Sequence, residues 1–111
     1  MAGFELDRDL ILARLGGDES LLAMIVDLFL EECENNCALL ENSWTKGDIP
    51  SLAREAHTIK GLLLTVSDEA GSASAYALET QARQGNTDGL DVAVAGVLAR
   101  MREVAGVLGR R

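Results

Sequence analysis

Hydrophobic residues recur along this 111-residue chain with the spacing of amphipathic α-helices. Glycine and aspartate divide the pattern into segments, because glycine commonly ends a helix and aspartate caps its first turn. Five helices are predicted: a short one over 7–15, a long one over about 18–45, and three more over about 48–66, 69–84 and 90–108. Alanine and leucine dominate, while β-branched and aromatic clusters are few, so the pattern favours an all-α fold.

Apolar stripes on the long segments predict the core of the fold. The last segment repeats apolar residues at alternating spacings of four and three: Leu90, Val94, Val97, Met101, Val104 and Leu108. The long second segment offers Leu22, Ile25, Phe29, Leu40 and Trp44. Short connections between long amphipathic helices make them antiparallel neighbours. We therefore expect one domain over 1–111, an up-down-up-down antiparallel four-helix bundle with a short extra N-terminal helix.

Charge and hydropathy exclude several classes of protein. A net charge of −8 opposes nucleic-acid binding, which needs a basic surface. Apolar runs fall short of the roughly 20 residues that span a bilayer. Acidic residues Glu5, Asp7 and Asp9 stand where a secretory signal would be apolar. We expect a cytoplasmic protein without nucleic-acid or membrane partners; Met1 and the lack of a linker favour a freestanding chain, and monomer is the default.

Two cysteines, Cys33 and Cys37, lie four residues apart in the long second segment. A closed metal site needs about four ligands, and the chain has one histidine. A disulfide between positions four apart would require awkward geometry within a helix. Buried, reduced thiols are the expectation, and we expect no metal and no cofactor on this chain.

The single histidine, His57, lies on the polar side of its predicted helix. Histidine is the side chain that ordinarily changes charge near neutral pH. At about 100° per residue, the apolar stripe of this helix fills a sector of about 80° whose centre is about 140° from His57. The stripe consists of Leu52, Ala56, Ile59, Leu63 and Val66. This geometry predicts an outward histidine rather than one buried against the core.

Three residues share the outward side of the helix with His57. Arg54 and Lys60 flank it on adjacent turns and place positive charge within an acidic protein. Gly61 lies in mid-helix, where glycine costs about 1 kcal/mol relative to alanine. The arrangement predicts a docking surface for an anionic group, with another molecule's backbone passing close to Gly61.

The run from Ala56 to Gly61, Ala-His-Thr-Ile-Lys-Gly, resembles the motif of the histidine phosphotransfer (HPt) family, a helical His-x-x-Lys-Gly usually preceded by alanine. The resemblance covers nearly the whole chain. Other stretches similar to the family pattern are Leu15-Gly16-Gly17-Asp18, Leu28-Phe29, Gly47-Asp48 and Leu78-Glu79.

The resemblance implies a phosphorelay intermediate. His57 would accept a phosphoryl group from an aspartyl phosphate on a receiver domain and pass it to another receiver's aspartate. Lys60 would offset charge on the phosphoryl oxygens, Gly61 would give the partner clearance, and Arg54 and Leu64 would contact the partner. The partners would be receiver domains of a hybrid sensor kinase, a response regulator or both. Mg²⁺ and most catalytic groups would belong to the receiver, so the chain would be a phosphoryl carrier and not an enzyme.

The chain departs from the family pattern just after Gly61. Leu62-Leu63-Leu64 stand where small residues are usual, and Ser67-Asp68 stand where a Gly-Ala pair is usual. Leu64 returns almost to the angle of His57, two turns along the helix. Leu64 either adds an apolar contact, narrows the range of receivers, or marks a domain that docks without transferring. We favour a functional domain with altered partner choice.

Two further classes stay open from the sequence. One is a non-transferring scaffold or inhibitor that docks receivers through the same face, for which Leu64 is the pointer. The other is a small hydrolase or transferase with His57 as general base. That class lacks a nucleophile or an orienting carboxylate three or four residues from His57. Phosphorylation of His57 by a partner separates the carrier from the scaffold.

Overall fold

The computed structural model describes residues 3–110, and within that range the chain is helical with no strand. The helices are α1 (Arg8–Arg14), α2 (Glu19–Thr45), α3 (Ile49–Thr65), α4 (Glu69–Arg83) and α5 (Leu90–Leu108). The all-α prediction is confirmed, and each predicted segment corresponds to one helix, with ends that differ by a residue or so. The predicted helix over 7–15 is trimmed to Arg8–Arg14 because Asp7 is its cap.

Aspartate side chains set where most of the helices begin. A carboxylate accepts a hydrogen bond from an N–H of the first turn, a group that has no partner within the helix. The caps of α1 to α4 are Asp7, Asp18, Asp48 and Asp68. Pro50 lies in the first turn of α3, where a missing N–H costs nothing.

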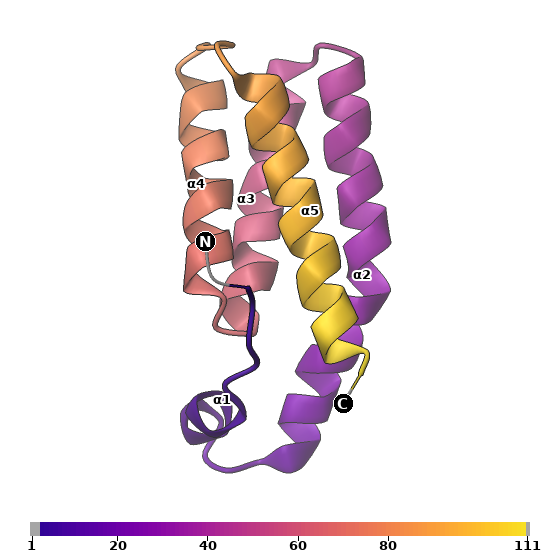
Figure 1. The fold of residues 1–111 in the computed structure, drawn as a ribbon, viewed down its shortest axis with the longest axis vertical. Coiled ribbons are helices and arrows are strands. Elements are labelled where there is room, and N and C mark those ends of the chain that lie inside the picture. Colours follow the sequence, from indigo (N-terminus) through magenta and orange to yellow (C-terminus); the bar gives the residue numbers. More distant parts are fainter. Residues whose placement is uncertain (1–2, 111) are drawn as a thin grey trace.

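Helices α2 to α5 form an antiparallel bundle in which the chain runs up, down, up and down (Figure 1). Each helix packs against the next, and α5 closes the bundle against α2. The molecule as a whole measures 42 × 22 × 21 Å. At about 1.5 Å per residue, α2 is far longer than α3 or α4, so its first turns project beyond the other helices.

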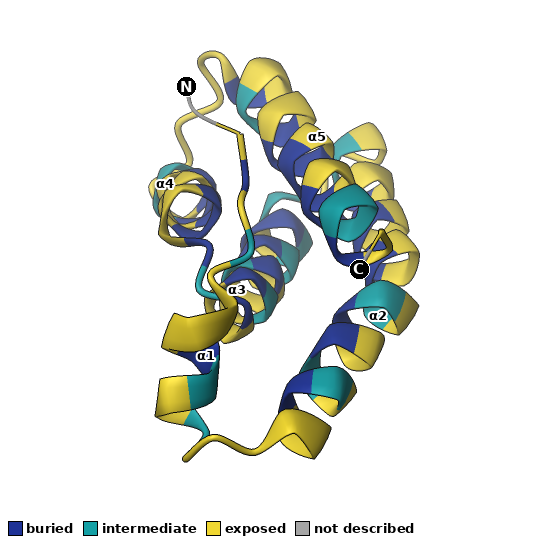
Figure 2. Ribbon diagram, turned by 60° about the horizontal axis from the view of Figure 1, so that its bottom comes forward, coloured by how far each residue is buried: buried dark blue, intermediate teal, exposed yellow. Residues whose placement is uncertain are grey.

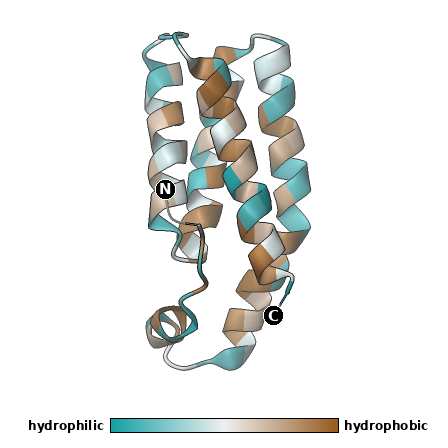
Figure 3. Ribbon diagram, viewed as in Figure 1, coloured by the Kyte–Doolittle hydropathy of each residue, from teal (hydrophilic) through white to brown (hydrophobic). Residues whose placement is uncertain are grey.

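Helix α1 lies across the bundle axis beside the projecting part of α2, and Figure 1 shows it nearly end-on. Arg8 at the start of α1 pairs with Glu19 at the start of α2. Figure 3 shows that the projecting part of α2 is more hydrophobic than its far end. Some of this apolar surface stays exposed, at Leu21, Met24 and Leu28.

Buried residues line the interior of the bundle, and exposed residues face outward (Figure 2). The predicted stripes of α3 and α5 are buried at every position. On α2, Leu22, Phe29 and Leu40 are buried as predicted, while Ile25 and Trp44 are half-buried and pack against the core. Val26, which the predicted stripe did not include, is also buried. Trp44 lies in the last turn of α2.

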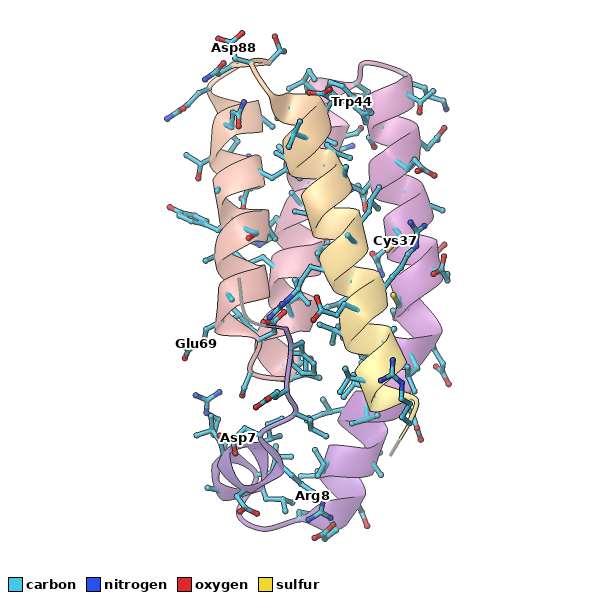
Figure 4. The ribbon with its side chains drawn as sticks, viewed as in Figure 1. Asp7, Arg8, Cys37, Trp44, Glu69 and Asp88 are labelled. Atoms are coloured by element: carbon cyan, nitrogen blue, oxygen red, sulfur yellow. The ribbon has the colours of Figure 1, made fainter. Side chains whose placement is uncertain are left out.

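The two cysteines are buried and unpaired, as predicted. Figure 4 shows Cys37 on the side of α2 that faces α5, and the Cys33 thiol donates to the Met101 carbonyl at 3.6 Å. A hydrogen bond with Cys33 and burial both raise the pKa of the Cys37 thiol. Among residues 3–110 no group of three or more His, Cys, Asp or Glu side chains is placed to hold a metal ion. No helix in the described part of the chain is long and apolar enough to cross a membrane.

A buried ion pair ties the turn between α3 and α4 to α5. Two Arg100 nitrogens donate to the two Asp68 oxygens at 2.7 and 2.8 Å. Arg100 also faces Glu103, whose carboxylate accepts from the Phe4 amide at 2.7 Å. The segment before α1 is therefore fastened along α5, with the Phe4 ring buried.

Candidate functional site

His57 lies in the middle of α3 with its side chain 60% exposed. The predicted outward orientation is confirmed. The core stripe of α3 faces the bundle interior and leaves His57 on the side towards α4, the helix that packs most closely against α3.

The Glu79 carboxylate of α4 meets the histidine ring. Its two oxygens lie 3.1 and 3.2 Å from His57 Nδ1, and its side chain is only 8% exposed. An ionised carboxylate only accepts hydrogen bonds, so Nδ1 carries the hydrogen. The Nε2 nitrogen then keeps its lone pair and is the ring atom available for attack. The sequence missed this orienting carboxylate because it comes from the neighbouring helix.

Two more cations surround the same carboxylate. Lys60 Nζ lies 3.4 Å from Glu79 Oε1, and Arg83 Nε and Nη2 each lie 3.0 Å from Oε2. Burial alone would raise the pKa of Glu79, but the hydrogen bonds from Arg83 and His57 and the charge of Lys60 outweigh it and lower the pKa. Glu79 is therefore an anion at neutral pH, and it orients all three side chains.

Lys60 is less outward than its angle on the helix predicted. Its side chain is only 23% exposed, and the ammonium reaches across to α4 instead of standing in solvent. The prediction that Lys60 flanks His57 holds, because both side chains contact the same carboxylate.

Arg54, Gly61 and Leu64 lie on the surface of α3 as predicted. Arg54 donates to the Ser51 hydroxyl at 2.8 Å. A Cβ added at Gly61 would meet no atom within 4 Å, so packing within the bundle does not require glycine there. Leu64 is 48% exposed, and Leu63 beside it is fully buried.

An open groove lies between the start of α3 and the end of α4. Arg54 and Arg83 are among its lining residues, with Pro50 and Ala82. The sequence did not single out Arg83. A signal for it was present in the sequence: the spacing of Ala75, Leu78 and Ala82 places Glu79 on the apolar stripe of its helix, and Arg83 follows Glu79 by one turn.

The described site is thus an exposed imidazole with its tautomer fixed, a cation on each side, and a glycine that leaves open space. The family model of the Hpt domain matches residues 24–106, which include all of α3 and α4. Searches of the curated proteins and of solved structures gave no significant match. Because the family match spans most of the chain and contains the site, the chain belongs to the histidine phosphotransfer family, whose members carry phosphoryl groups in two-component relays.

Proposed function

We propose that His57 accepts a phosphoryl group from the aspartyl phosphate of one receiver domain and passes it to the aspartate of another. The observation that supports this most directly is the contact between buried Glu79 and Nδ1 of a largely exposed His57. A solvent-facing imidazole with one fixed nitrogen is suited to attack a group that a second protein delivers.

In the transfer step, the Nε2 lone pair forms a bond to phosphorus as the phosphorus–oxygen bond of the acyl phosphate breaks. The electrons of the broken bond return to the receiver's aspartate as a carboxylate. The imidazole ring becomes positive while Nδ1 keeps its proton, and the Glu79 anion stabilises that charge. The reverse sequence passes the phosphoryl group on, so one site serves both donor and acceptor.

The neighbouring residues have distinct roles in this proposal. Lys60 turns from Glu79 to the phosphoryl oxygens as their charge comes close. Gly61 gives the receiver's loops clearance, and Arg54 offers a surface cation to the acidic partner. The chain acts as a carrier, with Mg²⁺ bound by the receiver.

The deciding experiment incubates the protein with receiver domains from the same genome, charged with labelled phosphate and Mg²⁺. We expect acid-labile, base-stable label on the wild type and none on His57→Gln. Receivers that bind the protein but keep their label would favour the alternative, a non-transferring scaffold.

Leu64 is the residue that pointed to the non-transferring scaffold as an alternative to the phosphoryl carrier. Its exposed side chain lies on the same side of α3 as His57. We predict that Leu64→Ala changes transfer by different factors with different receivers, since each would lose a different apolar contact. Val92→Ala on α5 is the matched control, as Val92 is also an exposed apolar side chain. An identical rate for every receiver would remove Leu64 from partner choice.

The third class, a hydrolase, gains the orienting carboxylate that the sequence lacked near His57. The two thiols and the nearest hydroxyl on α3 do not supply its nucleophile. The Cys33 and Cys37 thiols are buried on α2, and the Thr58 hydroxyl donates to the Arg54 carbonyl.

A further inference from the structure

The Tyr76 ring is a second partner of the Lys60 ammonium, besides the Glu79 carboxylate. Lys60 Nζ lies 5.0 Å from the centroid of the Tyr76 ring and 3.4 Å from Glu79 Oε1. A cation within about 6 Å of an aromatic face is attracted by the ring quadrupole. Tyr76 is itself 57% exposed, so burial in the core does not account for a tyrosine here.

We propose that Tyr76 is a positioning residue for phosphoryl transfer, acting through Lys60. This rests on the proposed function of His57. A lysine side chain is flexible and would otherwise sample solvent. The ring keeps the ammonium beside α4, within one helical turn of His57.

The Glu79 and Tyr76 contacts of Lys60 differ in how many ammonium N–H donors they leave available for a phosphoryl group. Glu79 is an anion and competes with phosphoryl oxygens for the ammonium donors. The Tyr76 ring attracts the charge without taking up a conventional acceptor position, so N–H groups stay free. When a phosphoryl group reaches His57, Lys60 leaves Glu79 for the phosphoryl oxygens while the ring continues to hold it. The role requires the ring and not the hydroxyl.

A small donor separates this role from docking, because Tyr76 is exposed and a receiver could also touch it. Phosphoramidate transfers its phosphoryl group directly: the bond from Nε2 to phosphorus forms, the phosphorus–nitrogen bond of the donor breaks, and ammonia leaves. The rate of His57 phosphorylation is followed by ³¹P NMR for the wild type, Tyr76→Phe and Tyr76→Leu. The same leucine substitution is made in a Lys60→Ala background.

We expect Tyr76→Phe to match the wild type and Tyr76→Leu to be slower by about two- to fivefold, the range of an exposed cation–π contact. In the Lys60→Ala background, Tyr76→Leu should have no further effect. A loss of equal size in that background, or equal rates for all Tyr76 variants, would overturn the proposal while leaving the function of His57 intact. If wild-type His57 is phosphorylated neither by phosphoramidate nor by any charged receiver domain, both this proposal and the proposed function are overturned.

A proton NMR measurement tests the geometry without any phosphoryl donor. The ε-methylene protons of Lys60 should be shifted upfield by the ring current in the wild type and in Tyr76→Phe. The shift should vanish in Tyr76→Leu. Unshifted protons in the wild type would show that the ring does not hold Lys60 and would overturn the proposal.

Discussion

Glu79 accepts hydrogen bonds from His57 and Arg83 and faces Lys60, although its own side chain is almost fully buried. A buried carboxylate is stable only where partners replace its lost hydration. In the proposed function, His57 and Lys60 act on one phosphoryl group, and Glu79 holds these two side chains near one another. The burial of Glu79 thus depends on the same contacts that arrange the site. Removal of its charge should therefore affect both the stability of the protein and phosphoryl transfer.

The dependence of the free energy of unfolding on acidic pH tests whether Glu79 is charged in the folded protein. Its folded pKa lies below its ordinary value of 4.5, so its contribution is fully present above that value and is lost as pH falls through the folded pKa. We predict that the free energy of unfolding of Glu79→Gln falls less steeply below about pH 4.5 than that of the wild type. Urea unfolding at several pH values measures this. Glu31→Gln, at an exposed position of α2, is the control; parallel curves for wild type and Glu79→Gln would contradict the assignment.

Gly61 provides a second test at the residue scale, because its effects on folding and on transfer should have opposite signs. Alanine is better than glycine in a helix interior by about 0.5–1 kcal/mol, and the space beside Gly61 is open. We predict that Gly61→Ala stabilises the protein by about that amount. It should also slow transfer from a receiver while leaving phosphorylation by phosphoramidate unchanged.

Gly96→Ala is the matched control for Gly61→Ala. Gly96 lies inside α5, and an added Cβ there would also meet nothing within 4 Å. The two variants should be stabilised alike in thermal unfolding. Receiver-dependent transfer that is unimpaired by Gly61→Ala would show that no partner backbone comes close at this position.

At the scale of elements, the turn between α3 and α4 differs from the other helix ends. The turns that follow α1, α2 and α4 have glycine at positive φ, while the turn after α3 has Ser67 at φ 58°. Residues with a Cβ pay about 1–2 kcal/mol in this conformation. The Ser67 hydroxyl accepts a hydrogen bond from Arg14 of α1 at 2.7 Å. This contact between α1 and the turn offsets part of the backbone strain at Ser67.

A double-mutant cycle separates these two effects. In an Arg14→Ala background, Ser67→Gly relieves the strain with no hydrogen bond left to lose, and we predict a stabilisation of about 1 kcal/mol. In the wild-type background the gain should be smaller by the value of the Arg14 contact. Urea unfolding of the four proteins measures both. A Ser67→Gly that is destabilising in the Arg14→Ala background would show that the turn is not strained.

The helices were predictable from the sequence because the residues that determine them lie close together in the chain. The aspartate caps, the terminating glycines and the apolar stripe around Ile59 lie within a few residues of the structures they determine. Contacts between helices were not predictable in this way. Glu79 is 22 residues from His57, and Arg100 is 32 residues from Asp68. Such pairs depend on how helices rotate and slide against one another, which the periodicity of a single helix does not determine.

Across the whole molecule, the Asp68–Arg100 pair joins parts of the chain that are otherwise far apart in sequence. Asp68 also caps α4 through the Gly71 amide, and a Cβ at Gly71 would overlap its carboxylate. The guanidinium of Arg100 lies 5.9 Å from the Phe4 ring centroid. The N-terminal segment, the α3–α4 turn and α5 therefore meet at one buried charge pair.

Loss of Asp68 should be costly because it removes the two shortest hydrogen bonds of the buried Arg100 guanidinium and leaves its longer contact with Glu103, at 3.4 Å. We predict that Asp68→Ala lowers the free energy of unfolding by about 3–5 kcal/mol. In the double variant with Arg100→Met, an apolar side chain replaces the buried cation, and most of the loss should be recovered. About 1 kcal/mol should remain for the missing α4 cap. Urea unfolding of the singles and the double measures the coupling; a double variant no more stable than Asp68→Ala would show that desolvation of Arg100 is not the source of the cost.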